Sequence, residues 1–374
     1  GNSIYVKFPM KDDKGKLKGI VDTLDNLYVV IWTTTTWTLP GNLAVSLNPE
    51  FVYVVVEAGS ERYIMAKDLA GNVMDSAGIS EYKVLGEILG SDLEYTVCRH
   101  PFLDRDSLVI VGDHVTLEAG TGCIHTAPGH GAEDFEVCRK YPEIDVVVPV
   151  DGKGHLTSEA GQFEGLYYKA ANKAILQELK ESGMLLAEEN ITHQYPHCWR
   201  CKEPIIYRAT EQWFISIDKI KKQALEAIKE VRWTPKWGEE RISKMVEDRG
   251  DWCISRQRIW GLPIPIFYCN SCGKEIINDQ TIEAVQALFE KEGSNAWFKY
   301  EAEEILPEGF TCECGGHEFR KESDIMDVWF DSGSSHVAVA EANPELGWPV
   351  DMYLEGSDQY RGRSEERRVG KECR

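Results

Sequence analysis

The chain has 374 residues, of which 43% are hydrophobic and 28% are charged, and its formal net charge is −21. This length allows two or three domains with cores of their own, and the composition is ordinary for a globular protein. No apolar run approaches the ~20 residues that a membrane-spanning helix needs, and no signal peptide is visible. The acidic charge does not exclude nucleic-acid binding, because a local basic strip can act inside an acidic protein.

Residues 1–190 predict a mostly β, barrel-like domain. Short β-rich runs alternate with turn residues, and many short strands with few helices favour a closed sheet. Two helices are expected, over residues 131–139 and 168–182, and the second ends at Gly183 in a C-cap position. The predicted strands cover residues 3–8, 28–32, 52–57, 107–111 and 146–150.

Residues 191–263 predict a helical connection, because the composition shifts to Cys, His, Trp and Arg and the apolar spacing becomes helical. Its two helices are expected over residues 218–231 and 238–247, with a break at Pro235.

Residues 264–320 predict a small cysteine-bearing module, and residues 321–362 predict strand and loop. Residues 363–374 show no periodicity and are similar to the translation of a common sequencing adaptor, so we expect a non-native tail. Because the chain begins at Gly1 without methionine, we also expect a part of the protein upstream.

Four consecutive threonines, Thr33 to Thr36, follow an apolar run that ends at Trp32. β-Branched residues favour an extended backbone, and their hydroxyls both donate and accept hydrogen bonds. An edge strand with solvated threonines would have the same local composition. Trp37, Pro40 and Asn42 follow at fixed positions, however, and the whole segment therefore predicts a small polar pocket.

A glycine-rich loop, residues 120–134, carries two histidines and ends in an acid pair. Glycines let the backbone approach a ligand closely. Asp134 can pair with an ammonium group, and His125 can bind the ligand or orient a water molecule. No nucleophile–histidine set has a workable spacing, and Cys123 is interpreted as a packing residue. The chemistry that we predict is therefore direct attack by water.

Together the two segments resemble the editing site of the isoleucyl-tRNA synthetases, which are class I aminoacyl-tRNA synthetases. The resemblance implies hydrolysis of tRNA(Ile) that is wrongly charged with valine. One methylene in a hydrophobic pocket is worth only ~1–3 kcal/mol, and the isoleucine–valine pair is itself the standard example of this limit. The residues that the resemblance assigns to the editing site are Thr33, Thr34, Thr35, Asn42, His125 and Asp134.

The threonine turn departs from the family pattern at two positions. The family usually has Pro where Thr36 stands and often Ala where Gly41 stands. Loss of Pro removes a restraint on φ, which would loosen the turn. Thr35 stands where the valyl and leucyl enzymes usually carry Arg, which favours the isoleucyl branch.

Two close cysteine pairs, Cys269 with Cys272 and Cys312 with Cys314, predict a Zn²⁺ site. Four thiolates make a tetrahedral cage with no open position, so the metal would be structural. Reduced, unmetallated thiols are the alternative. In a chain without an export signal this spacing indicates metal binding in a reducing compartment, and we expect a cytoplasmic protein.

Cys198 and Cys201 form half of a second metal site. In the family they join another cysteine pair that lies upstream. His193 or His197 could complete a makeshift site, but in this chain we expect the pair to be unmetallated.

Three further segments resemble the class I catalytic domain: residues 251–258, 327–335 and 354–362. The arginines of the first either meet the tRNA acceptor end or pair with nearby acids. By resemblance Trp329 flanks the isoleucine side chain. The contacts with the aminoacyl-adenylate are assigned to Glu355, Gly356, Asp358 and Gln359.

The resemblance covers residues 3–362 and implies an α/β fold, in which a β-barrel-like editing domain is inserted in a Rossmann-type class I catalytic domain. Residues 321–362 would begin the second Rossmann half, next to the zinc module. The His-Ile-Gly-His and Lys-Met-Ser-Lys-Ser signatures of the family are absent, so the resemblance implies an internal fragment.

The whole protein would ligate isoleucine to tRNA(Ile) with ATP, which only the full-length form would use. We expect tRNA(Ile), isoleucine and valine as partners, Zn²⁺ as the cofactor, no membrane and a monomer. Two alternatives are a non-catalytic tRNA-binding or zinc scaffold and a free-standing trans-editing hydrolase. The second would need neither a zinc module nor a Rossmann segment.

Overall fold

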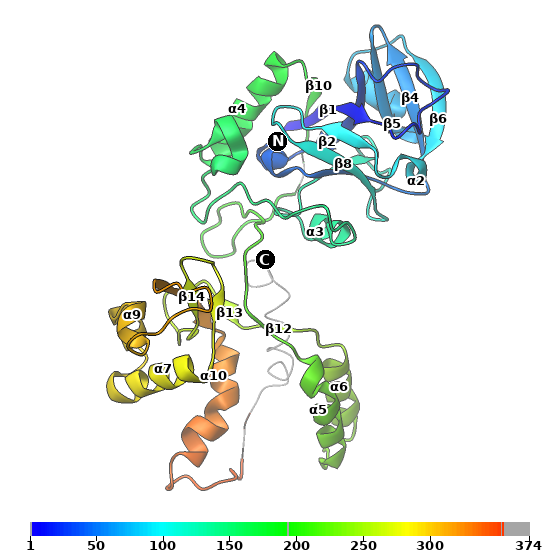
Figure 1. The fold of residues 1–374 in the computed structure, drawn as a ribbon. Coiled ribbons are helices and arrows are strands. Elements are labelled where there is room, and N and C mark those ends of the chain that lie inside the picture. Colours follow the sequence, from blue (N-terminus) through cyan, green and yellow to red (C-terminus); the bar gives the residue numbers. More distant parts are fainter. Residues whose placement is uncertain (1, 193, 353, 355–374) are drawn as a thin grey trace. The chain divides into compact units, whose positions relative to one another are not determined.

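The computed structural model describes residues 2–192, 194–352 and 354 (Figure 1). Its contacts form two compact units, Gly1–Thr210 and Glu211–Arg374, called unit 1 and unit 2 below. Within the described residues, no helix combines the length and the apolar character that crossing a membrane requires.

Unit 1 is built on a single sheet in which part of the strands close into a ring. The strands are β1 (Asn2–Asp12), β2 (Leu27–Thr33), β3 (Ala44–Leu47), β4 (Val52–Ala58), β5 (Glu61–Ala66), β6 (Lys83–Leu89), β7 (Val97–Arg99), β8 (Asp106–Val111), β9 (Cys123–Thr126) and β10 (Leu185–Asn190). Their order is β10-β1-β7-β8-β3-β9-β2-β5-β4-β6, and β1 also pairs with β2. The ring therefore runs from β1 through β7, β8, β3, β9 and β2 back to β1, which confirms the barrel-like prediction.

Helices of unit 1 lie between and beside these strands. They are η1 (Thr36–Gly41), η2 (Lys67–Leu69), α1 (Ala70–Ser76), α2 (Gly90–Leu93), α3 (Ala132–Cys138), η3 (Ser158–Phe163) and α4 (Tyr168–Glu181), where η marks 3₁₀ turns in this unit. The two helices expected from the sequence correspond to α3 and α4. The strand β10 ends at Asn190, whereas the contacts of unit 1 continue to Thr210. They do so because Ala209 N–H donates to the Gly129 carbonyl at 2.7 Å.

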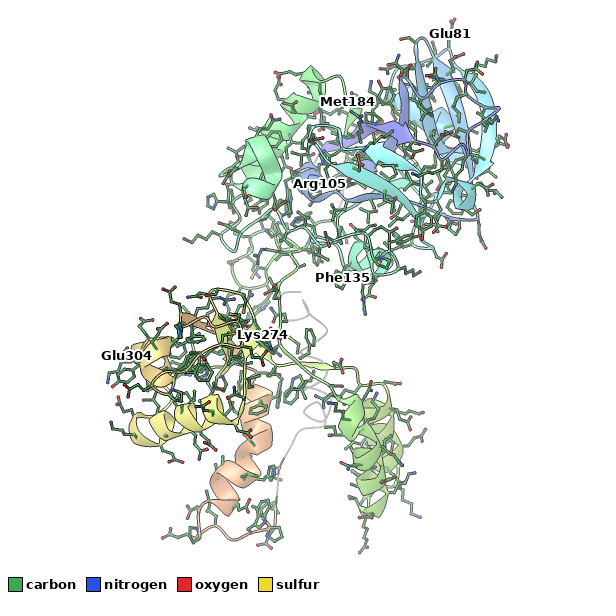
Figure 2. The ribbon with its side chains drawn as sticks, in the orientation of Figure 1. Glu81, Arg105, Phe135, Met184, Lys274 and Glu304 are labelled. Carbon is green, nitrogen blue, oxygen red and sulfur yellow. The ribbon has the colours of Figure 1, made fainter. Side chains whose placement is uncertain are left out.

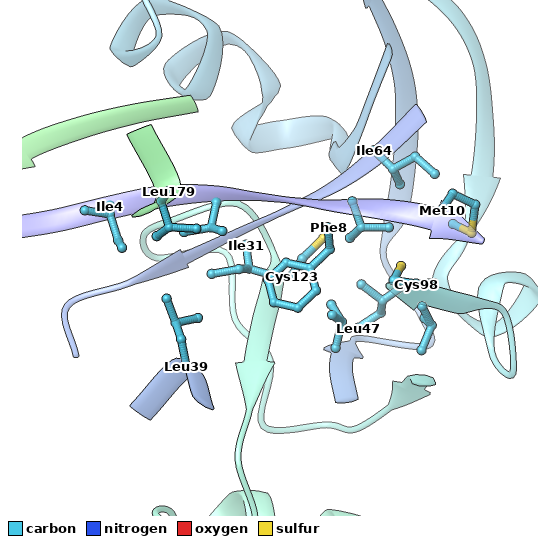
Figure 3. Packing of buried hydrophobic residues seen from close by; sticks show 14 of the residues in the cluster. Ile4, Phe8, Met10, Ile31, Leu39, Leu47, Ile64, Cys98, Cys123 and Leu179 are labelled. Atoms are coloured by element: carbon cyan, nitrogen blue, oxygen red, sulfur yellow. The ribbon is translucent and has the colours of Figure 1, made fainter. Parts of the chain in front are cut away.

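The interior of the ring is apolar (Figure 3). Alternate residues of β1, among them Ile4, Phe8 and Met10, point into this core, as the two-residue period of a strand requires. Leu39 of η1 and Leu179 of α4 belong to the same cluster. Each such burial contributes about 1.5–3 kcal/mol, so the core fixes the position of η1 as well as the strands.

The strand predicted over residues 146–150 is wrong. Only Val150 forms a bridge there, with Leu156. Pro149 has no N–H to donate, which disfavours a ladder. The Val147 carbonyl instead packs against Gly129, where a Cβ atom would lie only 2.3 Å from it.

Unit 2 combines short strand pairs with several helices. It contains β11 (Phe214–Ile215), α5 (Asp218–Glu230), α6 (Trp237–Glu247), β12 (Trp252–Cys253), β13 (Ser255–Arg256), β14 (Phe267–Cys269), β15 (Glu275–Ile276), α7 (Asp279–Glu292), α8 (Ala296–Lys299), α9 (Ala302–Ile305), β16 (Phe319–Lys321), β17 (Ile325–Met326), α10 (Val328–Ser335) and a π-helical turn, η4 (His336–Glu341). β11 pairs with β12, β13 pairs with β17, and β15-β14-β16 form a small sheet. The helices expected over residues 218–231 and 238–247 correspond to α5 and α6.

The strand-and-loop prediction for residues 321–362 is wrong at residues 328–335, which form α10. The helix begins where the Asp327 side chain accepts a hydrogen bond from the Trp329 N–H at 3.0 Å. That contact is an N-cap, and it favours a helix in a segment whose composition suggests a strand.

Candidate functional site

The two segments singled out in the sequence meet at one edge of the ring in unit 1. β2 and β9 are parallel neighbours, with Trp32 opposite Ile124. Because the carboxyl ends of parallel strands lie at the same edge of a sheet, the threonine turn that follows β2 lies beside the loop that follows β9. The rings of Trp37 and His130 are in contact there, with centroids 5.0 Å apart.

His125 lies at the centre of a buried hydrogen-bond network. Its Nδ1 accepts from the Asn42 amide at 2.8 Å, and its Nε2 contacts the Thr38 hydroxyl at 3.0 Å. The Thr38 hydroxyl donates onward to the Thr35 carbonyl at 2.7 Å. Asn42 is completely buried, and its side-chain oxygen accepts from the Ser107 hydroxyl.

This network fixes the protonation of His125. Since Asn42 donates to Nδ1 and the Thr38 hydroxyl donates elsewhere, the proton of the neutral ring is on Nε2. Burial, followed by the nearby His100 and His130, lowers the pKa of His125 to about 3. The ring is therefore neutral near pH 7, and both of its nitrogens bond protein atoms. It ties the threonine turn to β9, and any direct contact with a ligand stays a prediction.

Asp134 is the acidic group of the site. It lies in the first turn of α3, and its Oδ2 accepts from the Ala127 N–H at 2.8 Å. Burial raises the pKa of Asp134 to about 6, although the Ala127 bond acts in the opposite direction. A Cβ at position 131 would lie 2.9 Å from the Asp134 carboxyl carbon, so Gly131 leaves the space that the carboxylate occupies.

The threonine turn presents hydroxyls at the edge. Thr33 is buried at the end of β2, and its hydroxyl accepts from the Thr35 N–H at 3.1 Å. Thr34 and Thr35 are partly exposed, and no protein atom among the described residues bonds their hydroxyls. These two hydroxyls can therefore reach a ligand at this edge.

The packing around position 41 explains why glycine suits it. A Cβ there would lie 3.0 Å from Cδ2 of His130 and 3.3 Å from Cδ of Pro149. The Cβ of an alanine would crowd the His130 ring, which faces the turn. Gly41 therefore allows a closer approach of the two segments.

A cluster of four thiols lies in unit 2. The Sγ atoms of Cys269 and Cys314 are 3.6 Å apart, those of Cys272 and Cys312 are 3.7 Å apart, and all four lie within 4.8 Å of one another. A tetrahedral zinc with Zn–S bonds of ~2.3 Å would place its sulfurs ~3.8 Å apart, so the cluster fits such an ion. Backbone N–H groups, chiefly that of Cys272, lower the pKa of Cys269 to about 6, which favours the thiolate.

Cys198 and Cys201 lie on a turn in unit 1, closed by the Lys202 N–H donating to the Cys198 carbonyl at 2.9 Å. Within the described part of the chain they gather no third metal-binding side chain. His197 donates through Nδ1 to the Tyr195 carbonyl at 2.8 Å, and His193 lies outside the described residues. A metal at this pair stays a prediction.

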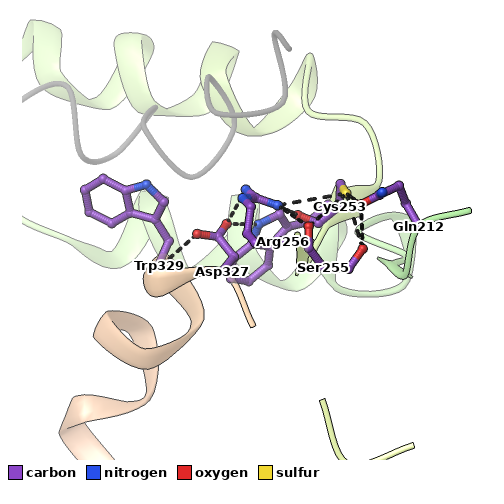
Figure 4. Close-up of polar contacts among 7 residues, drawn as sticks. Gln212, Cys253, Ser255, Arg256, Asp327 and Trp329 are labelled. Atoms are coloured by element: carbon purple, nitrogen blue, oxygen red, sulfur yellow. Dashed lines mark hydrogen bonds and ion pairs between the residues drawn. The ribbon is translucent and has the colours of Figure 1, made fainter. Parts of the chain in front are cut away.

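Asp327 connects two of the segments that resemble the catalytic domain (Figure 4). Its side chain is fully buried and accepts from the Arg256 guanidinium at 3.0 Å, the Trp252 indole at 2.8 Å and the Trp329 N–H at 3.0 Å. The start of α10, which carries Trp329, is thereby tied to β12 and β13. The predicted adenylate contacts, Glu355, Gly356, Asp358 and Gln359, lie outside the described residues.

Sequence reasoning missed Thr38 and Ser107 as partners of the site. Thr38 lies in the threonine turn itself, so its hydroxyl was a visible candidate. Ser107 is 65 residues from Asn42, and no local pattern relates the two positions.

Comparison with known proteins identifies close relatives of the chain. The family described as "tRNA synthetases class I (I, L, M and V)" matches residues 13–367. An isoleucine--tRNA ligase from Thermoanaerobacter sp. (strain X514) is 62% identical over 361 residues, which are 96% of this chain and 39% of that protein. An isoleucine--tRNA ligase from Moorella thermoacetica is 59% identical over 361 residues, again 96% of this chain and 38% of that protein.

Solved structures show a weaker likeness. The cytosolic leucyl-tRNA synthetase editing domain of P. falciparum is 9% identical, with a TM-score of 0.41, and the match covers 49% of this chain and 98% of that one. The chain spans about 39% of the length of the curated relatives that it matches.

Proposed function

We propose that this chain, which belongs to the class I tRNA synthetases (I, L, M and V), is part of an isoleucine--tRNA ligase whose unit 1 hydrolyses tRNA(Ile) wrongly esterified with valine. The parallel pairing of β2 and β9 carries the proposal, because it brings the threonine hydroxyls and the loop of Asp134 to one edge. The whole protein would attach isoleucine to tRNA(Ile) with ATP.

The side chains at this edge suit a simple hydrolysis. Asp134, ionised above about pH 6, would pair with the α-ammonium group of the aminoacyl ester. The hydroxyls of Thr34 and Thr35 would hold the ester and the attacking water. Attack of water on the ester carbonyl breaks the bond to the tRNA ribose and releases valine and the free hydroxyl. Neutral His125 would hold the turn in place and take up no proton.

A small, rigid pocket would give the selectivity. Valine would fit, whereas isoleucine carries one more methylene and would meet the buried turn. Positioning of the ester relative to the water would supply most of the rate, since no nucleophilic side chain takes part. The barrel core beneath η1 gives the pocket the stiffness that this discrimination needs.

In unit 2 we assign a structural Zn²⁺ to Cys269, Cys272, Cys312 and Cys314, which the spacing of their sulfurs supports. Bound zinc would cross-link the loops that flank the small sheet. Trp329 would contact isoleucine in the synthetic site of the whole protein, and the network of Asp327 would position it. Residues 1–190 would form the editing domain and residues 264–320 the zinc module.

The test is deacylation of Val-tRNA(Ile) and Ile-tRNA(Ile) by this chain. We expect faster loss of the valyl ester and at least a hundredfold slower reaction in Asp134→Ala. Glu133→Ala, which removes the exposed neighbouring acid, is the matched control and is expected to stay active. Retained tRNA binding without hydrolysis would instead favour a non-catalytic module.

A further inference from the structure

We propose that Arg105 and His100 are positioning residues that hold the C-terminal end of η1 and thereby set the selectivity of the editing pocket. This inference rests on the proposed editing function. It concerns side chains that come from the loop between β7 and β8, which are 61 and 65 residues from the carbonyls of η1 that they bond. Neither residue belongs to the two segments that the sequence indicated.

η1 is too short to satisfy its own ends. A six-residue 3₁₀ turn has few internal bonds at its ends, and the Leu39 carbonyl accepts from one backbone N–H, that of Asn42, at 2.9 Å. At its other end, the Trp37 N–H donates to Oδ1 of Asn172 in α4 at 3.0 Å. The ends of η1 are therefore held by side chains of other elements.

His100 bonds the Leu39 carbonyl, near the C-terminal end of η1. Its Nε2–H donates to the Leu39 carbonyl at 2.8 Å, while its Nδ1 accepts from the Leu103 N–H at 3.1 Å. The ring is only 5% exposed and packs edge-on against Phe102, with centroids 4.5 Å apart. Burial lowers the pKa of His100 to about 3, so these roles do not change across the working pH range.

Arg105 bonds the next carbonyl of η1, that of Pro40. One guanidinium nitrogen donates to the Pro40 carbonyl at 2.7 Å, and another donates to the carbonyl and carboxylate of Glu159 at 3.3 and 3.5 Å. Figure 2 labels Arg105 among the side chains of unit 1. The His100 N–H donates to the Arg105 carbonyl at 2.8 Å, so both side chains leave one tight loop.

The clamp, by which we mean the His100 and Arg105 side chains on η1, acts on the pocket through Thr38. This residue of η1 bonds both the Thr35 carbonyl and His125, so a shift of η1 moves the turn that carries the exposed hydroxyls. Discrimination between two substrates that differ by one methylene is about 10–200-fold and requires a rigid pocket wall.

The decisive experiment compares Arg105→Gln with the unaltered chain, using kcat/KM for Val-tRNA(Ile) and Ile-tRNA(Ile). We expect the preference for the valyl ester to fall about tenfold, because a looser turn admits isoleucine. Arg105→Lys, which keeps a charged donor, is expected to restore part of the preference. Arg99→Gln removes an exposed arginine of β7 and is the control, with an unchanged ratio.

Amide hydrogen exchange gives a second measurement that needs no activity. The Thr38 and Asn42 N–H groups bond the Thr35 and Leu39 carbonyls at 3.2 and 2.9 Å. We expect both to exchange faster in Arg105→Gln, with the barrel strands unchanged, and not in Arg99→Gln. His100→Gln retains a hydrogen-bond donor, whereas His100→Leu does not. We therefore expect the two amides to exchange less rapidly in His100→Gln than in His100→Leu.

The outcomes separate the two proposals. Equal losses of both activities with an unchanged ratio, or unaltered exchange in η1, would overturn the positioning role while the editing function stands. If the unaltered chain hydrolyses neither ester, the proposed function fails. Exchange of Thr38 and Asn42 then decides whether the clamp exists, and with it whether Arg105 positions the turn.

Discussion

The threonine turn of unit 1 and the thiol cluster of unit 2 differ in what holds their side chains in place. Around His125 the protein supplies every partner, and the turn rests on the buried core of the barrel. Cys269 ends β14 and the other three cysteines lie on short loops, beside a much smaller apolar cluster, and the four sulfurs lie within 4.8 Å of one another. A site made of protein contacts survives without its ligand, whereas a cage of thiolates depends on the ion it encloses.

Metal removal would sharpen this contrast most. We expect a chelator, or Cys312→Ser, to unfold the module around the cysteines, since structural zinc contributes ~10–16 kcal/mol in isolated zinc-finger peptides. Zinc content and amide exchange measure the effect, with the strands of unit 1 as the internal control. A module that keeps its protection without metal would contradict the assignment.

Loss of Asp327 is the next largest effect and tests whether unit 2 also contains a site held by protein contacts alone. Asp327→Ala would remove the buried carboxylate that pairs with Arg256 and accepts from Trp252 and Trp329, and breaking a buried pair costs ~3–5 kcal/mol. Urea unfolding, followed by a signal from unit 2, measures this. Asp218→Ala breaks a pair between an exposed carboxylate and the partly exposed Lys221, and is expected to cost under ~1 kcal/mol. Similar losses in the two variants would remove the distinction.

Substitution of Asp134 tests how much folding stability the unit 1 site costs. Its folded pKa of about 6 lies above the unfolded value, so the folded state holds the proton longer. Its stabilising contribution is complete below about pH 4 and is lost as the pH rises through about 6. Asp134→Asn should therefore stabilise the chain at pH 7 by about 1–3 kcal/mol and not at pH 4, while hydrolysis of the valyl ester is lost.

Unfolding free energies at several pH values check this expectation. The hydrolysis rate of the unaltered chain should fall in parallel as the pH drops below about 6, because the carboxylate takes up its proton there. A stability difference that does not depend on pH would show that ionisation of Asp134 is not the cause.

The smallest effect concerns α7 in the cysteine module. Asn278 caps this helix by accepting from the Thr281 N–H at 3.0 Å. Asn278→Ala should cost about 1 kcal/mol, measured by denaturant unfolding with metal bound. Gln286→Ala, on the exposed surface of the same helix, is the control. A loss of several kcal/mol would mean that the helix, and not the metal, holds the module together.

Local signals allowed much of the fold to be predicted. The periodicity and Pro235 located α5 and α6 within one or two residues, since a helix contains its own hydrogen bonds. The same reasoning failed at residues 146–150, where β-branched residues pack against Gly129 instead of pairing. It also missed α10, because one capping carboxylate outweighed the composition of the segment.

The site was predictable where a motif is continuous and unpredictable where its supports are distant. The threonines, His125 and Asp134 belong to two recognisable segments, and the structure brings these segments together. His100 and Arg105 contact η1 across more than sixty residues, and only the closed sheet determines that they meet it. Supports of this kind follow from topology, which a single sequence does not contain.

The pairing of β1 with β10 brings the first and last strands of the barrel side by side. Asn2 lies opposite Asn190, so the backbone enters and leaves the barrel at adjacent points, ~5 Å apart as in any strand pair. A connection between these two ends would therefore need only a short turn, and the ten strands between them could keep their pairing if the chain were joined there and opened elsewhere.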